Sequence, residues 1–328
     1  MIQSASAEGF TGSDLVRLGA NLSLGVTPAD LTARTMETPI YAGRLLAHEV
    51  QAGLTVTATD ITYLTDQDFT VDVEPSLVCG ILIEGHDEGV EIGRHGYVSR
   101  VRDRPVLYGF RGAQRCRRTC VRAQRCKSAG FLLKPAFFDR FGDAVTDDGL
   151  LTLREFATAE FRTMTLARSA RLLEIARRIL DHPYNGSLGE LFLESSALAL
   201  VVETAEQLKQ ERSTIALIGR RHYERVMEAR DIIDADLVAT PTSLALARRV
   251  GVSVTTLQAN FKIVFSTTIF GYVRDQRLMM ARVLLTEHGL SAAEAGYRVG
   301  FSSPAAFSAA FRRRFGRPPG QESGRSLS

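Results

Sequence analysis

The stretch TPTSLALARRVGVSVTTLQANFKIVF, residues 240–265, decides the fold of the C-terminal third of the chain. Leu244, Ala247 and Val250 recur at helical spacing and predict the inner face of a short helix. Gly251 suits the positive backbone angle of a tight turn between two helices. Ser253 is a favourable N-cap for the helix that follows. The stretch therefore predicts a helix-turn-helix.

The second helix of this motif is predicted to have an apolar face and a polar face. Its apolar residues Leu257, Phe261 and Val264 lie at i, i+4 and i+7, which places them on the inner side. The outer side then carries Thr255, Thr256, Gln258 and Lys262. Hydroxyl and amide groups at the start of such a helix can reach base edges in the major groove of DNA. A lysine one turn later is suited to phosphate contact, so we expect these four residues to bind DNA.

The pattern recurs about 50 residues later in SAAEAGYRVGFSSPAAFSAAFRRRFG, residues 291–316. Gly300 takes the place of the turn glycine, Ser303 that of the cap, and Phe307 and Phe311 point inward. The intervening stretch FGYVRDQRLMMARVLL predicts one longer helix, with Leu278, Ala281, Val283, Leu284 and Leu285 available for packing. The repeat ends in Arg312, Arg313 and Arg314, which we expect to contact phosphates. The alternative is that these arginines only form a solvated helix face.

This array of motifs closely resembles the AraC family of bacterial transcription regulators over residues 221–320. The resemblance implies two helix-turn-helix motifs that offer helices to successive major-groove segments, and an activator that meets RNA polymerase at promoters. Family members often carry arginine after the glutamine of the first DNA-reading helix, where this chain has Ala259, and Ala309 takes the matching place in the second. We therefore expect Thr255, Thr256 and Gln258 to supply most base readout. Ser308 and the arginines then serve the second motif.

The N-terminal part is predicted to be a β domain. Over residues 40–110, alternating and β-branched segments are separated by Gly, Asp and Pro every 8–12 residues, which favours a sandwich or barrel. Residues 131–142 predict a strand and a short helix, whereas residues 1–39 give no clear pattern. The AraC resemblance implies a cupin-like β-barrel sensor, which we assign to residues 1–150. The predicted fold class is therefore α+β, with an all-α C-terminal domain over residues 219–328.

Residues 151–218 are predicted to form a helical hairpin. Helical apolar spacing runs through residues 166–180 and again through residues 187–211, with the turn HPYNGS between them. The apolar positions of the second helix are Leu188, Leu191, Phe192, Ser195, Leu198 and Val202. Such a hairpin commonly packs against a partner subunit, so we expect a homodimer. The alternative is that it only covers the β domain.

The composition is that of a soluble globular protein. The chain has 328 residues, of which 45% are apolar and 23% charged, which excludes wholesale disorder and a collagen-like repeat. Its longest apolar runs, such as LVCGILI, are shorter than the ~18–20 residues of a membrane span. The N-terminus shows no secretory signal, and four cysteines in a chain of this length favour a reducing cytoplasm. We expect a bacterial cytoplasmic protein without a membrane partner.

The charge is unevenly distributed. Residues 1–93 carry 3 basic and 14 acidic side chains, whereas residues 94–127 carry 11 basic and 1 acidic, and residues 220–328 carry 16 and 9. Two basic regions therefore indicate two anionic partners. The first contains RGAQRCRRTCVRAQRCK, residues 111–127, in which five arginines are spaced 4, 3, 4 and 3 apart. They are Arg111, Arg115, Arg118, Arg122 and Arg125.

If residues 111–127 were helical, these five arginines would share one face, within about 80° of one another. No acid lies inside the stretch to relieve their repulsion, so the segment is predicted to bind an anion. Arginine in particular indicates planar recognition of phosphates or guanine edges. The alternative interpretations are a solvated basic face and an auxiliary DNA contact.

The R-x-x-x-R element occurs twice, at Arg111–Arg115 and Arg118–Arg122, and resembles the arginine motif by which PilZ domains bind cyclic di-GMP. Only an imperfect counterpart of their second element is present, at residues 21–25. Together with the C-terminal array, this resembles the CuxR-type AraC-like regulators, which respond to cyclic di-GMP. The resemblance implies that the five arginines bind this cyclic dinucleotide. The alternative is another ligand, such as a ferric siderophore or small metabolite, because the helix pair also resembles regulators of that sort.

Nothing in the sequence predicts an enzyme, a cofactor or a metal site. Cys116, Cys120 and Cys126 lie in a strongly basic segment, which opposes metal cations. His86 and His95 flank acidic residues, but the metal-binding H-x-H pair of metallocupins is absent, and a surface loop is the simpler interpretation. We found no catalytic serine motif, P-loop or dinucleotide fingerprint. An enzyme fused to a DNA-binding module would need clustered acid and base residues in the barrel, and we find none.

Overall fold

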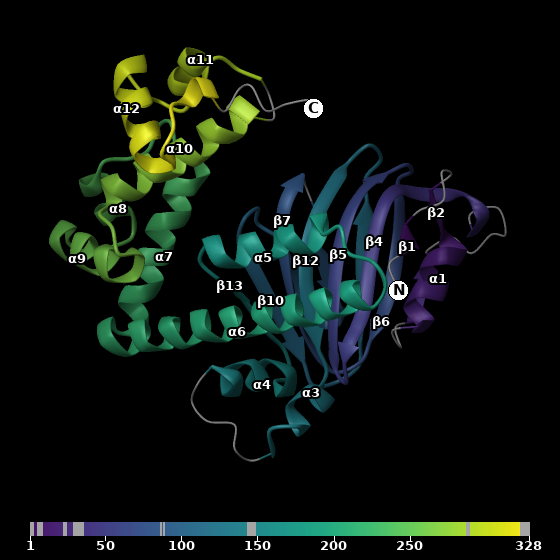
Figure 1. Ribbon diagram of the computed structural model, residues 1–328. Helices are drawn as coiled ribbons and strands as arrows, with labels where there is room; N and C mark the ends of the chain where they lie inside the picture. Colours follow the sequence, from purple (N-terminus) through teal and green to yellow (C-terminus); the bar gives the residue numbers. More distant parts are fainter. Residues whose placement is uncertain are drawn as a thin grey trace. The chain divides into compact units, whose positions relative to one another are not determined.

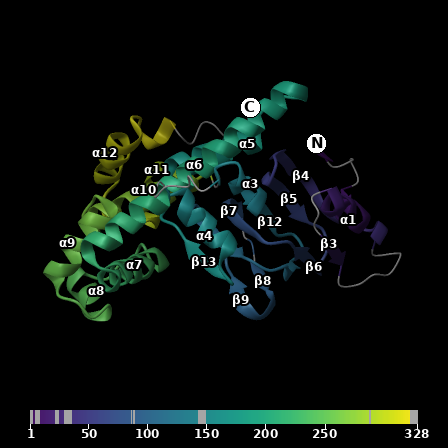
Figure 2. The same ribbon diagram turned by 90° about the horizontal axis from the view of Figure 1, so that it is seen from below.

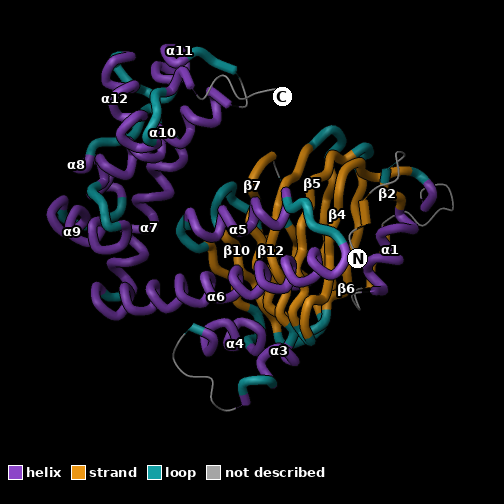
Figure 3. Tube along the Cα trace, viewed as in Figure 1, coloured by secondary structure: helices purple, strands orange, loops and turns teal. Residues whose placement is uncertain are grey.

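The computed structural model describes residues 3–4, 9–21, 25–28, 36–85, 87, 89–142, 149–286 and 289–321 (Figure 1). The chain divides into two compact units, residues 1–210 and 211–328. The first is a mixed unit of sheets and helices and the second is helical, so the fold class is α+β, as predicted (Figure 3). No helix within the described ranges combines the length and the apolar character needed to cross a membrane.

The described strands of the first unit form two antiparallel sheets rather than one closed barrel. The larger sheet has the order β1-β4-β5-β12-β7-β10-β13, with β2 paired to β4. Its strands are β1 (Gln3–Ser4), β2 (Phe10–Thr11), β4 (Pro39–Gln51), β5 (Leu54–Tyr63), β7 (Ser76–Gly85), β10 (Pro105–Phe110), β12 (Arg125–Leu133) and β13 (Arg162–Thr165). The smaller sheet has the order β3-β6-β11-β8-β9. Its strands are β3 (Gly25–Pro28), β6 (Gln67–Val73), β8 (Val90–Ile92), β9 (Gly96–Val98) and β11 (Gln114–Cys120).

One face of the larger sheet is covered by helices and carries the main core of the unit. The helices α5 (Ala170–Asp181) and α6 (Gly186–Ile218) lie across this face, with α3 (Pro135–Asp139) and α4 (Leu150–Thr158) beside them (Figures 1 and 3). Strand residues such as Val56 and Phe131 pack there against Leu172 and Leu200. The short helix α1 (Gly12–Asn21) packs on the strands β2 and β4 at the other end of the sheet.

The other face of the larger sheet packs against the smaller sheet (Figure 2). Two separate apolar clusters fill this space. The first contains Phe10, Leu15, Ile40, Tyr41, Ile61, Tyr63, Leu82, Cys120 and Cys126, and the second contains Val90, Ile92, Val98, Val106, Tyr108, Phe110 and Cys116. Each cluster includes residues from both sheets, so the space between the sheets is a true interior.

The helix pair forms as predicted, but its second helix is longer. The Ser169 hydroxyl caps α5 by accepting a hydrogen bond from the Leu172 N–H. The helix α6 continues past residue 211 to Ile218, so the division between residues 210 and 211 falls inside it. Residues that bury α6 against the sheet include Leu193, Leu200 and Leu208. Leu188, Leu191 and Val202, which the apolar spacing singled out, are instead more than 60% exposed.

The second unit consists of α7 (Arg220–Ala235), α8 (Ser243–Arg249), α9 (Val254–Phe265), α10 (Ile269–Thr286), α11 (Ala292–Arg298) and α12 (Pro304–Phe315). Each motif has its own small core: Leu246, Val250 and Phe261 lie in the first, and Leu278, Phe307 and Phe311 lie in the second. The predicted inner face of α8 was wrong at one position. Leu244 is half exposed, and Leu246 takes its place in the core, because Leu246 lies four residues before Val250 and so shares its face.

Candidate functional site

The two helix-turn-helix motifs share one hydrogen-bond pattern in their turns. In the first, the Val250 N–H donates to the Leu246 carbonyl and the Val252 N–H to the Ala247 carbonyl. In the second, the Val299 N–H donates to Ala295 and the Phe301 N–H to Gly296. Gly251 and Gly300 both adopt positive φ, at 70° and 86°, where a side chain would be strained. The repeat in the sequence is therefore a repeat in backbone geometry.

Helix α9 presents the predicted polar residues, but not all of them equally. The Ser253 hydroxyl caps the helix by accepting from the Thr256 N–H at 3.0 Å. The Thr256 hydroxyl lies 2.8 Å from the same oxygen, so it is partly occupied by the cap. Thr255, Gln258 and Lys262 are exposed on the outer face. Thr255 and Gln258 are therefore the residues on α9 best placed to contact bases.

Helix α12 presents a different surface. Ser303 caps it, and Pro304 occupies its first turn. Ala305, Ala306 and Ala309 are exposed, whereas Ser308 is only partly exposed. Arg312, Arg313 and Arg314 are exposed in the last turn, and the Arg314 guanidinium lies 5.4 Å from the centre of the Phe315 ring. The α12 surface thus combines small side chains with positive charge, as a phosphate-contacting helix requires.

Arg277, on α10, connects the two motifs. Its Nε donates to the Leu237 carbonyl at 2.7 Å and its Nη2 to the Val238 carbonyl at 3.0 Å, in the segment between α7 and α8. Its Nη1 donates to the Gly300 carbonyl at 3.0 Å, in the turn of the second motif. A Cβ at Gly300 would lie 3.1 Å from this guanidinium. Arg277 therefore fixes the second turn to the framework of the first motif.

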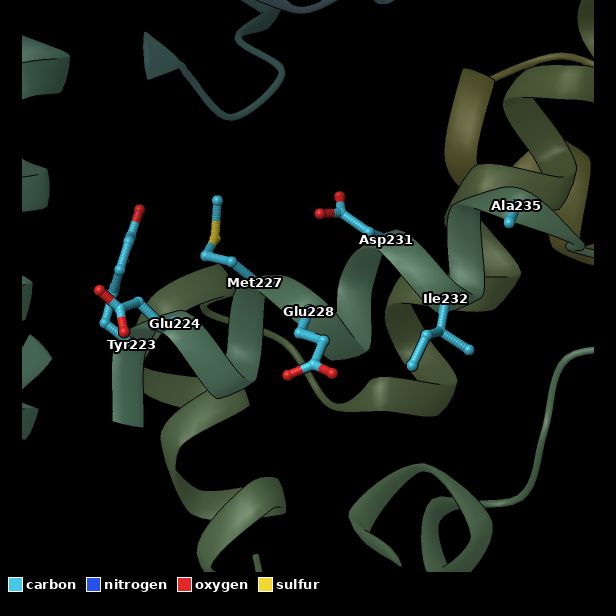
Figure 4. Close-up of a pocket in the computed structure, with 7 residues that line it drawn as sticks. All are labelled: Tyr223, Glu224, Met227, Glu228, Asp231, Ile232 and Ala235. Atoms are coloured by element: carbon cyan, nitrogen blue, oxygen red, sulfur yellow. The ribbon is translucent and has the colours of Figure 1, made fainter. Parts of the chain in front are cut away.

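A shallow pocket on α7 is lined in part by carboxylates (Figure 4). Its lining consists of Tyr223, Glu224, Met227, Glu228, Asp231, Ile232 and Ala235. Glu228 pairs with Arg225 at 2.8 Å and Asp231 with Arg230 at 2.6 Å. Arginines of the same helix thus pair with two of the three carboxylates, so the charge of this pocket does not assign it a role.

The arginine-rich segment is not a helix, and the helical interpretation of residues 111–127 was wrong. Residues 114–120 form β11 and residues 125–133 form β12, so side chains alternate between the two faces of a sheet. On β11, Arg115 and Arg117 point outward, whereas Arg118 lies on the inward side with the buried Cys116 and Cys120. The five predicted effector-binding arginines therefore do not share one face. Their part in binding an effector stays a prediction.

Carboxylates from neighbouring strands pair with the outward arginines. Arg115 makes two contacts to Asp72, with Nε 2.9 Å from Oδ1, and Arg117 pairs with Asp68 at 2.5 Å. Arg125 contacts Asp60 and Glu84 at 3.2 and 3.1 Å. The Arg122 N–H donates to Asp66, and the Arg111 N–H to the Ala159 carbonyl. The segment itself contains no acid. Its acidic partners come from residues 60–84, which the pairing of β5, β6 and β7 with β11 and β12 brings beside it.

Arg118 belongs to a charged layer inside the unit. One oxygen of Asp87, Oδ2, accepts from the Arg118 Nη2 at 2.8 Å and from the Arg100 Nη1 at 2.9 Å. The other, Oδ1, accepts from the Gly89 N–H at 2.8 Å. The Asp87 side chain is only 5% exposed. We call Arg118, Asp87 and Arg100 the interior layer, and it carries two positive charges and one negative charge.

The surroundings of the interior layer are built to hold these charges. Burial alone would raise the pKa of the Asp87 carboxyl, but Arg118 and Arg100 outweigh it and hold the pKa well below its usual range. The Arg100 guanidinium lies over Gly80, where a Cβ would be 3.2 Å from Cζ. Burial raises the pKa of the Cys116 and Cys120 thiols to about 11 each, so both are protonated at neutral pH. They are therefore poor metal ligands and poor nucleophiles.

Tyr41 is the second polar feature of this interior. It is 2% exposed, it packs in the same apolar cluster as Tyr63, Cys120 and Cys126, and its ring centre lies 6.3 Å from that of Tyr63. Its hydroxyl has no hydrogen-bond partner among the described residues. A buried hydroxyl without a partner costs free energy, so this one calls for an explanation.

Several of these residues escaped the sequence analysis. Asp87 was assigned to a surface loop, and this was wrong because the loop turns its carboxylate inward. Arg100, Tyr41 and Arg277 carried no local signal, since their partners are distant in sequence. His95 stacks on Phe161 at 4.7 Å, whereas His86, Glu88 and residues 22–24 lie outside the described residues. In the described part of the chain, no group of three His, Cys, Asp or Glu residues is arranged to hold a metal ion.

Two family models match this chain. The one described as the regulatory protein PchR N-terminal domain matches residues 42–217, which is more than half of the chain. The one described as a helix-turn-helix domain matches residues 246–324.

Individual proteins match over shorter stretches. Regulatory protein PchR of Pseudomonas aeruginosa is 33% identical over 128 residues, which are 38% of this chain and 43% of that protein. The HTH-type transcriptional regulator GlxA of Rhizobium meliloti is 44% identical over 84 residues, 26% of each. The chain thus spans less than half the length of these curated relatives. A solved transcriptional regulator with an AraC-type DNA-binding domain, from Chromobacterium violaceum, is 30% identical over 31% of this chain and 91% of that one, with a TM-score of 0.30.

The first prediction concerns the interior layer. Asp87→Asn removes the shared carboxylate charge and leaves two guanidinium groups facing each other, so the free energy of unfolding should fall by about 3–5 kcal/mol. The native pKa of Asp87 lies below its unfolded value. Its contribution is therefore present above about pH 4 and is lost as the pH falls toward the native pKa. Urea unfolding followed by circular dichroism measures the change.

Asp72→Asn is the matched control, because it removes the carboxylate of the exposed Arg115 pair. Exposed pairs contribute little to stability, so this variant should unfold nearly as the parent does. Equal losses in the two variants would contradict the interior role of Asp87.

Proposed function

Since this chain belongs to the PchR family of AraC-type regulatory proteins, we propose that it is a sequence-specific, DNA-binding transcription regulator controlled by a small anionic effector. The observation that carries the proposal is the repeated motif with exposed helices α9 and α12, held together by Arg277. Two DNA-reading helices on one framework suit two successive segments of the major groove.

The two motifs are proposed to divide the work. On α9, Thr255 and Gln258 read base edges, with Thr256 in a smaller part, and Lys262 contacts a phosphate. On α12 the small residues allow close approach to the groove wall, Ser308 contacts the DNA, and Arg312 and Arg313 bind phosphates. Specificity therefore comes mainly from α9, whereas α12 adds affinity that does not depend on sequence.

A second copy of the chain is the proposed partner of the first unit. Leu188, Leu191, Ser195, Leu198 and Val202 are spaced 3, 4, 3 and 4 apart on α6. At 100° per residue they fall within about 80° of one another, which is the seam of a two-stranded coiled coil. Three of these apolar side chains are more than 60% exposed. We call this set the α6 stripe and propose that it forms a homodimer with its copy.

The proposed effector binds the first unit. The sequence suggested cyclic di-GMP at the arginine segment or, alternatively, a ferric siderophore or small metabolite. A cyclic di-GMP site at Arg115 would have to displace Asp72. The arginines are divided between two faces of the sheet, which gives cyclic di-GMP little support. A ferric siderophore or small metabolite is the alternative effector. Activation through RNA polymerase is the proposed outcome at promoters.

The second prediction tests base reading. Gln258→Ala should weaken binding to a DNA site selected from random sequences by about 1–3 kcal/mol and should leave binding to unrelated DNA unchanged. Fluorescence anisotropy at fixed salt measures both affinities. Lys262→Ala is the contrasting variant, because loss of a phosphate contact weakens all sequences alike and reduces the salt slope by about 1. A uniform loss in Gln258→Ala would refute base reading by this residue.

The third prediction tests the link between the motifs. Arg277→Met removes three hydrogen bonds to backbone carbonyls, so the second unit should lose about 2–3 kcal/mol of stability. Affinity should fall more for a full site than for a half-site read by α9 alone. Arg274→Met, one turn earlier on α10, is the control. Parallel losses on full and half sites would show that Arg277 does not set the placement of the second motif.

The fourth prediction tests the α6 stripe. Leu191→Glu places a charge in the proposed seam, so the dimer should dissociate at least about tenfold more readily. Sedimentation velocity measures the dissociation constant. Leu217→Glu is the control, since Leu217 is equally exposed on the same helix but lies outside the stripe. A protein that is monomeric before mutation, or one dissociated equally by both changes, would overturn the proposal.

A further inference from the structure

The space between the two sheets is not one continuous apolar core. The two apolar clusters are separate, and residues of the interior layer contact both sides. Arg118 lies between Cys116, which belongs to one cluster, and Cys120, which belongs to the other. Burying charge between apolar clusters is costly unless each charge is paired and hydrogen-bonded.

The interior layer has one more positive charge than negative charge. Asp87 satisfies one nitrogen of each guanidinium, through a single carboxylate oxygen. Each guanidinium carries five N–H donors in a planar fork, which matches the two oxygens of a carboxylate. One further carboxylate would balance the charge of the layer. The Arg118 side chain is 27% exposed, so it is reachable from solvent.

Tyr41 supplies an independent indication. Its buried hydroxyl lacks a partner among the described residues and lies in the cluster that Cys120 and Cys126 share with Tyr63. A ligand oxygen would satisfy this hydroxyl. The same cluster contains the aromatic and aliphatic side chains of Phe10, Ile61 and Leu82, which suit contact with an apolar body.

We propose that the interior layer binds a small organic anion, with one carboxylate on Arg118 and Arg100, a hydrogen bond from Tyr41, and an aromatic or aliphatic body between the two apolar clusters. This proposal rests on the proposed function, because the anion is then the effector. It differs from the cyclic dinucleotide hypothesis in the face of the sheet, in the arginine that matters most, and in the charge of the ligand.

The test uses the full-length protein and benzoate, with benzamide as its uncharged counterpart of nearly equal shape. Saturation-transfer NMR titration detects the weak binding expected of so small a probe. Benzoate should bind at one saturable site, and benzamide should bind at least about tenfold more weakly, because it cannot balance the charge. Absence of benzoate binding, or equal binding of the two probes, overturns the proposal.

Matched variants locate the site. Arg118→Met should raise the dissociation constant for benzoate at least about tenfold, whereas Arg115→Met, on the outward face of the same strand, should leave it unchanged. Undiminished binding in Arg118→Met overturns the proposal. Loss of benzoate binding in Arg115→Met together with retained binding in Arg118→Met also overturns the proposal. If cyclic di-GMP binding is then also lost in Arg115→Met and retained in Arg118→Met, the outward arginines are the site.

Tyr41→Phe covers the case in which Arg118→Met fails to fold. Removal of an unpartnered buried hydroxyl should leave the stability of the ligand-free protein unchanged or higher, yet weaken benzoate binding about threefold or more. If Tyr41 had only a structural role, Tyr41→Phe would not weaken benzoate binding while leaving stability intact. Unchanged benzoate binding therefore counts against the proposal. DNA binding is measured separately, so a chain that binds benzoate but no DNA refutes the proposed function alone.

Discussion

The single carboxylate of Asp87 is the constraint on which the interior of the sheet unit depends. Two guanidinium groups could not lie between apolar clusters without it, because their desolvation and mutual repulsion would exceed what packing returns. The two apolar clusters of this space are separate. The main core lies on the opposite face of the larger sheet, under α5 and α6, where apolar residues of strands and helices pack together. Both faces of the sheet therefore carry buried apolar side chains, and one of them also holds a paired set of charges.

In the helical unit, too, an arginine joins segments that are distant in sequence. Each motif is assembled locally: a hydroxyl caps its second helix, a glycine turns the chain, and a small apolar core joins the pair. Neither cap nor glycine determines how the two motifs are placed relative to each other. Helix α10 contributes side chains to both cores, and Arg277 on this helix adds a planar fork that spans carbonyls at residues 237, 238 and 300. In both units an arginine does what short-range structure cannot, because its rigid fork joins segments distant in sequence.

These two kinds of interaction explain what the sequence could predict. The helix-turn-helix motifs could be predicted directly, because their turns and caps depend on neighbouring residues. These are the turn glycines Gly251 and Gly300 and the capping serines Ser253 and Ser303. The helix pair could be predicted from its apolar spacing, but that spacing did not distinguish the exposed apolar positions of α6 from the buried ones. The arginine segment was misjudged because its period fits a helix, whereas sheet pairing with residues 60–84 decides its conformation. Asp87, Arg100, Tyr41 and Arg277 act through partners that only the fold brings near, and no local pattern marks them.

The unequal surfaces of α9 and α12 have a consequence for the DNA itself. If base discrimination resides in Thr255 and Gln258, while Pro304, Ala305 and Ala306 occupy the corresponding start of α12, then the information content of the binding site is concentrated in one segment. The other segment would be defined by its distance from the first segment and by how easily its groove takes the shape that fits the small side chains of α12. Operators of this protein would then tolerate drift over half their length while their spacing stays fixed. A regulator of this kind can acquire new target promoters with few base changes.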